Sequence, residues 1–208
     1  MEQNCFIDCY QKEENNMLDE KKLKEITSRV KLYLDERNVL TNQKKEFVAF
    51  FLSNAKKSLN CASALYDLSI DSKMQDKTGY VNFDGFLWVV NASYYSMFYM
   101  ARALLENEGI KLKSEQSIHA VTFDAMIHFF YSNGKLHKKL IEDFAESLED
   151  ASQILGKQKA DLLMEDYYFE KGKRAIFTYG TEKIVIQNKA KTSLLRARRF
   201  IEEIHAIL

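Results

Sequence analysis

The sequence predicts an all-α protein, and three observations support this expectation. The 208-residue chain contains no proline and only seven glycines, the residues that most often break helices and mark turns. Apolar residues recur at spacings of three and four in several long segments, which is the period of an amphipathic helix. A mixture of 46% hydrophobic and 29% charged residues is ordinary for a globular protein. We therefore expect an up-and-down antiparallel bundle of four to five core helices plus an N-terminal helical extension.

The segment from Phe83 to Gly109 is expected to form the central helix of this bundle. Between Phe86 and Leu105 the only charged residue is Arg102, and nearly every face of the predicted helix carries an apolar group. Such a helix must be surrounded by protein or by lipid. Three tyrosines, several polar side chains and a mean hydropathy of −0.36 favour a protein core over a membrane span.

The pattern divides the chain into an N-terminal extension (residues 1–40) and a helical bundle (residues 41–208). The extension is expected to contain one amphipathic helix, from about Asp19 to Asn38. Further helices are expected at about residues 42–68, 114–130, 136–155 and 183–207. Residues 69–82 break the helical period and carry Ser, Asp, Asn and Gly, so they predict a loop of about 14 residues.

Charge, cysteine content and missing motifs exclude several function classes. Lys plus Arg and Asp plus Glu are balanced at 30 each, so net charge provides no general attraction to nucleic acid. Cys5 and Cys9 have no second Cys/His pair to complete a zinc site, and the four histidines are scattered, so we expect no metal and no cofactor. The N-terminus has no signal-peptide pattern, which predicts a cytoplasmic protein with reduced thiols. Phosphate-binding glycine loops and the serine-hydrolase elbow are also absent from the sequence.

The predicted last helix carries a basic cluster that has two explanations. Its members are Lys189, Lys191, Arg196, Arg198 and Arg199, and Lys171, Lys173 and Arg174 precede them. Such a patch could contact the phosphates of a nucleic acid. Alternatively, it is the solvated face of a helix whose C-terminal end favours positive charge.

The order of residues in the central helix and beyond is similar to that of a known family. The matching residues are Ala92, Tyr94, Tyr95, Met97, Phe98, the run from Ala101 to Leu105, Gly109, His119, Gly134, Arg174, Tyr179 and Gly180. In this order they resemble the HEPN superfamily, and within it the small prokaryotic group of uncharacterised HEPN proteins. The resemblance covers about residues 44–208, so the first forty residues lie outside it.

The resemblance implies an all-α bundle that commonly pairs as a homodimer. Members are often partnered with a minimal nucleotidyltransferase in toxin–antitoxin or defence operons. Active members are metal-independent ribonucleases whose signature is an arginine, four to six residues of any kind, and then a histidine. In such a site histidine accepts the proton of the RNA 2′-hydroxyl, and arginine stabilises the negative charge that develops at phosphorus.

The sequence departs from this signature at the histidine. Arg174 is followed five residues later by Tyr179, and no histidine follows before His205. A tyrosine, with a pKa of about 10, is a poor general base at neutral pH. The sequence therefore favours binding of RNA or a nucleotide over ribonuclease activity, although Arg174 and Tyr179 stay the first catalytic candidates.

A weaker catalytic candidate lies near the end of the last predicted helix. Arg199 and Arg198 precede His205 by six and seven positions. On a regular helix Arg198 and His205 would share one face, about 10 Å apart. The alternative is an ordinary charged C-terminal turn.

The ligand-binding candidates are Arg174, Tyr179, Arg102, His119 and Tyr95. Arg102 has an alternative role, because a buried arginine usually pairs with a carboxylate or with backbone carbonyls. His119, in the first turns of a helix, could instead be a packing or capping residue. Tyr94 and Tyr95 are adjacent and point about 100° apart, so we expect one in the core and one at the surface or at a dimer interface.

These observations leave three candidate functions. The first is a dimeric HEPN-like protein that binds RNA or a nucleotide, as a component of a toxin–antitoxin or defence system with a nucleotidyltransferase partner. The second is a metal-independent endoribonuclease toxin. The third is a purely structural dimerisation module.

Overall fold

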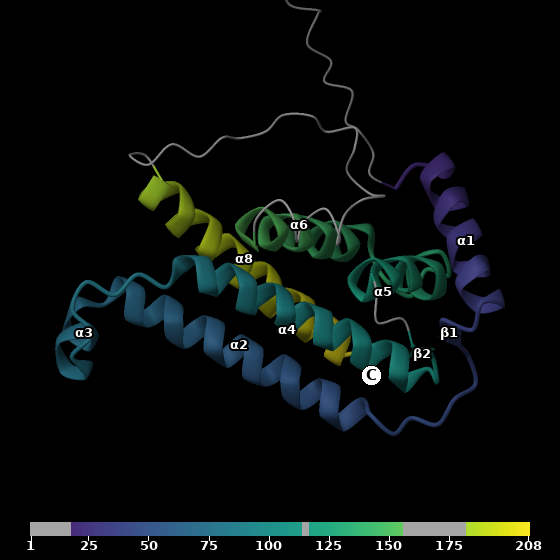
Figure 1. The fold of residues 1–208 in the computed structure, drawn as a ribbon, viewed down its shortest axis with the longest axis horizontal. Coiled ribbons are helices and arrows are strands. Elements are labelled where there is room, and N and C mark those ends of the chain that lie inside the picture. Colours follow the sequence, from purple (N-terminus) through teal and green to yellow (C-terminus); the bar gives the residue numbers. More distant parts are fainter. Residues whose placement is uncertain (1–17, 114–116, 156–181) are drawn as a thin grey trace, which may run out of the picture.

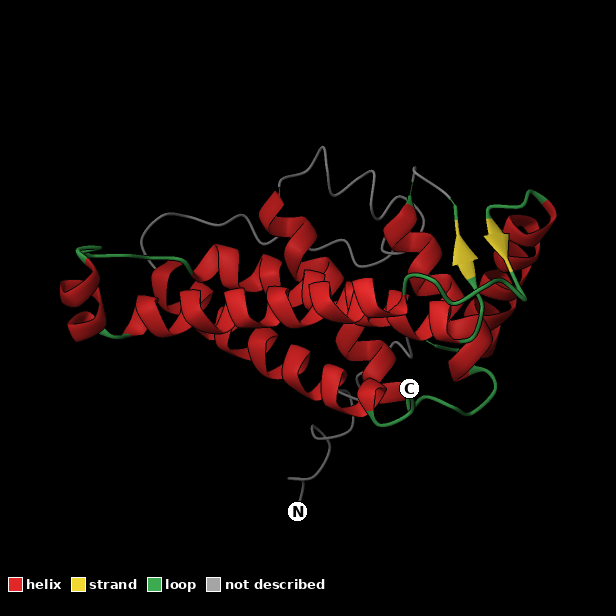
Figure 2. Cartoon of the chain, turned by 90° about the horizontal axis from the view of Figure 1, so that it is seen from below, coloured by secondary structure: helices red, strands yellow, loops and turns green. Residues whose placement is uncertain are grey.

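The computed structural model describes residues 18–113, 117–155 and 182–208, and within these ranges the fold is all-α (Figure 1). The predicted fold class is therefore confirmed. The helices are α1 (Glu20–Asp35), α2 (Val48–Ile70), α3 (Ser72–Thr78), α4 (Phe86–Asn107), α5 (Ile118–Met126), the π-helical turn η1 (Ile127–Tyr131), α6 (Lys138–Leu155) and α8 (Glu182–His205). Two short strands, β1 (Val39–Leu40) and β2 (Lys111–Leu112), pair antiparallel and were not predicted from the sequence (Figure 2).

Helices α2 and α4 pack side by side in opposite directions (Figure 1). At one end, the backbone N–H of Gly85 donates to the hydroxyl of Ser69, which joins the end of α2 to the start of α4. At the other end, the N–H of Phe47 donates to the buried carboxylate of Glu106 at 3.1 Å. This carboxylate satisfies a donor that the first turn of α2 leaves free, so the two helix ends are held together.

Helix α8 runs parallel to α4 and antiparallel to α6. Phe86, at the start of α4, packs in the same apolar cluster as Ala190 near the start of α8. The far ends also meet, since the side chain of Asn107 donates to the backbone oxygen of Leu208. Together α2, α4, α6 and α8 make the expected up-and-down bundle around α4.

Most of α4 is buried, as its sequence predicts, but one side is not. Met97 and Leu104 are almost fully buried in the largest apolar cluster. Trp88, by contrast, is 66% exposed and Tyr95 is 37% exposed. The expectation that other elements cover every face of this helix is therefore wrong for the side that carries these two rings. No helix in the described ranges is long and apolar enough to cross a membrane.

The helix of the N-terminal extension packs against α5 and η1. It begins after Asp19, whose side chain caps the first turn by accepting from the N–H of Lys22. Arg29 binds the buried carboxylate of Asp124 through two nitrogens, at 2.8 and 2.9 Å. Residues 18–40 therefore contribute a helix and a strand that contact the bundle.

The prediction of a loop at residues 69–82 is only partly correct. Helix α2 continues to Ile70, and α3 occupies residues 72–78. Asp71 makes this possible because its carboxylate accepts from the N–H groups of Lys73 and Met74 and so caps α3. The short helix then ends at Gly79, which adopts a left-handed conformation with φ of +77°.

Candidate functional site around His119

Three of the ligand-binding residues predicted from the sequence come together at one place. Helix α4 contributes Tyr94, Tyr95, Phe98 and Arg102, and the first turn of α5 contributes His119; we call these five residues the His119 cluster. Tyr94, Phe98 and Arg102 recur every four residues and so follow one side of α4. The ring centroids of His119 and Phe98 are 4.4 Å apart, and the ring of Tyr95 meets His119 edge-on at 5.9 Å.

A short hydrogen bond fixes the state of the histidine. The hydroxyl oxygen of Tyr94 lies 2.5 Å from Nδ1 of His119. Tyr94 is buried, and no other hydrogen-bond partner of its hydroxyl lies among the described residues. A buried O–H that donates to nothing is costly, so the phenol donates and Nδ1 accepts. The proton of the neutral imidazole is then on Nε2.

The surroundings keep His119 uncharged at neutral pH. Burial, with a smaller contribution from the Arg102 cation, lowers the pKa of His119 to about 4. Burial also raises the pKa of Tyr94 well above its usual value, with a smaller contribution from Tyr95. At pH 7 this pair is therefore a phenol bonded to a neutral imidazole, with the Nε2–H as a hydrogen-bond donor.

Arg102 contacts aromatic rings instead of a carboxylate. Its guanidinium carbon lies 4.8 Å from the ring centroid of Phe51 on α2 and 6.0 Å from that of Phe98. No ion pair joins Arg102 to a carboxylate within the described part of the chain. The expected internal carboxylate partner is thus replaced by two cation–π contacts. Burial lowers the pKa of Arg102, while Glu106 and Tyr99 oppose that change, and the guanidinium stays protonated.

The acidic residue nearest to Arg102 in the sequence, Glu106, binds other partners. Glu106, one turn after Arg102 on α4, accepts from the N–H of Phe47 and lies 3.8 Å from the ammonium of Lys111. Lys111 itself binds Glu46 at 3.0 Å. Glu106 therefore stabilises the junction of α2 and β2, and it acts on Arg102 electrostatically without an ion pair between them.

Much of the basic cluster on α8 is paired with acidic residues of α6. Arg196 pairs with Asp143, Glu146 and Asp150, Arg199 pairs with Asp143, and Lys189 pairs with Asp150. Asp143 is fully buried and also binds Lys139 at 3.2 Å, so this array joins two helices of the bundle. These pairs support a structural role for three of the five cations that the sequence pattern offers for phosphate contacts.

The remaining predicted site residues lie apart from the His119 cluster or outside the described residues. Arg198 donates to the hydroxyl of Ser63 on α2 at 3.2 Å, and His205 is exposed at the end of α8. Arg174 and Tyr179 fall within residues 156–181, which the structure does not describe. The described contacts join none of these residues to His119.

Two members of the cluster were not among the predicted site residues. Tyr94 and Phe98 belong to the pattern that resembles the HEPN superfamily, yet nothing in one sequence distinguishes them from ordinary core aromatics. The available signal is their spacing, since Tyr94 and Phe98 precede Arg102 by eight and four residues on an apolar helix. Their contact with His119 depends on how α5 packs against α4.

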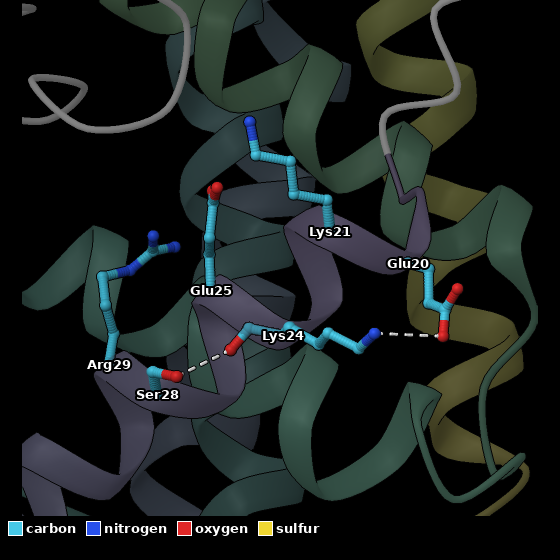
Figure 3. Close-up of a pocket in the computed structure, with 6 residues that line it drawn as sticks. All are labelled: Glu20, Lys21, Lys24, Glu25, Ser28 and Arg29. Atoms are coloured by element: carbon cyan, nitrogen blue, oxygen red, sulfur yellow. Dashed lines mark hydrogen bonds and ion pairs between the residues drawn. The ribbon is translucent and has the colours of Figure 1, made fainter.

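A separate pocket of about 680 Å³ is lined by side chains of α1 (Figure 3). The described residues that line it are Glu20, Lys21, Lys24, Glu25, Ser28 and Arg29. Lys24 pairs with Glu20 across one helical turn, and Arg29 is bound to Asp124. The charges that line this pocket are mixed and partly neutralised. The pocket is therefore a weaker candidate for a ligand-binding site than the His119 cluster. No group of three metal-ligating side chains occurs in residues 18–113, 117–155 and 182–208.

Comparisons with protein-family models, with curated proteins and with solved structures found no match to this chain.

Proposed function

We propose that this chain is a dimeric, cytoplasmic HEPN-like protein that binds RNA or a nucleotide through the His119 cluster. The observation that carries the proposal is the proximity of Arg102, His119 and Tyr95, whose side chains all lie near the ring of Phe98. Arg102 offers a cation to a phosphate, and the imidazole offers a second donor. The half-exposed tyrosine ring offers a surface on which a base can stack.

The resemblance to the HEPN superfamily supports the wider setting of this proposal. In that setting the protein is one component of a toxin–antitoxin or defence system, and a nucleotidyltransferase is its partner. The positions that carry the resemblance include Tyr95, Arg102 and His119, which the fold brings to one place.

The state of His119 favours binding over cleavage. A general base needs a free lone pair, and the lone pair of Nδ1 already accepts from Tyr94. The other ring nitrogen carries the proton, so it donates to a phosphate oxygen and does not accept from a 2′-hydroxyl. With its ring nitrogens in these states, His119 can bind RNA without promoting its cleavage.

The proposal is tested by fluorescence anisotropy with short labelled RNAs and with AMP as a competitor. Arg102→Ala should weaken binding about 10- to 100-fold, the range expected for the loss of a charge-assisted hydrogen bond. Lys24→Ala is the matched control, because Lys24 is an exposed cation on α1 whose ion pair is with Glu20. Equal affinities of wild-type protein and Arg102→Ala would contradict the proposal.

The enzyme alternative is examined with the same RNAs in the presence of EDTA. On our account they stay intact with wild-type protein. Cleavage that His119→Ala or Arg102→Ala abolishes would establish a ribonuclease site in this cluster. Cleavage lost in Arg174→Ala or His205→Ala, but kept in those two variants, would place the activity elsewhere.

A further inference from the structure

The uncovered side of α4 extends the candidate site well beyond the His119 cluster. Trp88, Tyr95, Tyr99 and Arg102 are separated by seven, four and three residues. At about 100° per residue they lie within a sector of roughly 60°. We call these four residues the aromatic strip. From Trp88 to Arg102 it measures about 21 Å along the helix axis.

The strip presents ring surface to solvent along much of its length. Trp88 is 66% exposed and Tyr95 is 37% exposed, while Tyr99 is half-buried beside Tyr95 with ring centroids 6.2 Å apart. Exposed rings also occur at the start of α2, which lies alongside α4 (Figure 1): Phe47 is 51% and Phe50 is 56% exposed. Several exposed aromatic rings on one side of a helix are typical of an interaction surface in soluble proteins.

The charges of the strip decide what kind of molecule fits it. Its one charged member is the Arg102 cation, which has no carboxylate partner in the described part of the chain. Glu106 follows on the same side of α4, but it is buried and bound to Phe47 and Lys111. If a second copy of the chain paired strip to strip, it would bring a like cation and no free carboxylate. A polyanion with aromatic groups complements both features, because phosphates bind arginine and bases stack on rings.

We propose that the aromatic strip binds an extended single strand of RNA, with a phosphate at Arg102 and bases stacked on Tyr95, Tyr99 and Trp88. This inference rests on the proposed function and defines its ligand as a strand instead of a mononucleotide. A strip of this length accommodates on the order of four nucleotides, the lower end of the site sizes of single-strand-binding grooves. Affinity therefore rises with RNA length up to this number and then levels off.

The single tryptophan of the chain provides a direct probe of this binding mode. RNAs of about two to about eight nucleotides, and AMP, are titrated against the protein while Trp88 emission is recorded. Stacking of a base on the indole should quench the emission with saturation for the longer RNAs and leave it unchanged for AMP. In parallel anisotropy measurements, Trp88→Leu should weaken binding of the longest RNA roughly 5- to 100-fold and leave the affinity for the dinucleotide unchanged.

The control is Leu32→Ala, which removes an exposed apolar side chain from α1 and should alter neither measurement. If AMP and the longest RNA bind equally tightly and Trp88 emission does not respond, the strand-binding mode is wrong while the proposed function stands. If neither ligand binds, both fail. The protein is also diluted without RNA, and its oligomeric state is followed by sedimentation. If a dimer dissociates and Trp88 emission shifts over the same range of protein concentration, a second copy covers the strip and the inference is overturned.

Discussion

Replacing His119 with asparagine tests the environment of the candidate site. The folded protein holds the pKa of His119 at about 4, whereas the unfolded chain has the ordinary value of 6.5. Between these values the unfolded state binds more protons, so the free energy of unfolding decreases as the pH falls. The contribution of neutral His119 to the free energy of unfolding is fully present above pH 6.5, and roughly 3 kcal/mol of this contribution is lost by pH 4.

The His119→Asn variant removes this titration while it keeps the local hydrogen bond. The side-chain oxygen of asparagine can occupy the position of Nδ1 and accept from Tyr94. Unfolding by urea is followed for both proteins at several pH values between 7 and 4. His128, whose pKa burial also lowers, is present in both proteins, so its contribution cancels in the difference.

Relative to the variant, wild-type protein should become less stable by roughly 3 kcal/mol as the pH falls over this range. If the difference in the free energy of unfolding between wild-type protein and the variant stays constant with pH, the reasoning is refuted. His119 would then titrate alike in folded and unfolded protein, and the argument for a neutral Nε2–H donor would fail.

Two further predictions concern the scaffold that positions the site, and both are measured by urea unfolding. Arg29→Ala leaves the buried Asp124 carboxylate without its two-nitrogen contact, so it should cost about 3–5 kcal/mol, and an Arg29→Met/Asp124→Leu double variant should recover most of this loss. A loss below about 1 kcal/mol for the single variant would show that the pair does not hold α1 to α5. Gly109→Ala should cost clearly more than the matched Gly134→Ala, although both glycines are left-handed, with φ of +70° and +71°. A Cβ at Gly109 would lie 2.9 Å from the carbonyl oxygen of Gln43, whereas nothing lies within 4 Å at Gly134, where only the backbone cost of about 1–2 kcal/mol applies. Equal losses would contradict this account.

The long helices were predictable because local sequence determines them. The apolar period around Met97 and Leu104 is enough to define α4, and the pattern of Ala190, Leu194 and Ala197 does the same for α8. Helix α3 was missed because its seven residues carry no apolar period and depend on the Asp71 cap and on Gly79. Strands of two residues each likewise leave too little pattern to detect.

The candidate site was predictable only in part. Tyr95, Arg102 and His119 were named from the sequence and the resemblance, but their proximity depends on how α5 packs against α4. The surroundings of Arg102 could not be read from spacing. They depend on Phe51, which precedes Arg102 by 51 positions, and on the commitment of Glu106 to other partners.

The proton on the His119 ring offers the most direct test of the central claim, that His119 and Arg102 form an anion-binding site. Side-chain ¹H–¹⁵N correlation spectra at pH 7 report which nitrogen carries the proton and whether a ligand perturbs it. We predict a neutral imidazole with its proton on Nε2, whose resonance shifts when short RNA is added to wild-type protein and requires a higher concentration of the same RNA to shift in Arg102→Ala. A proton on Nδ1, a charged imidazolium, or a resonance that saturating RNA leaves unchanged would contradict the account.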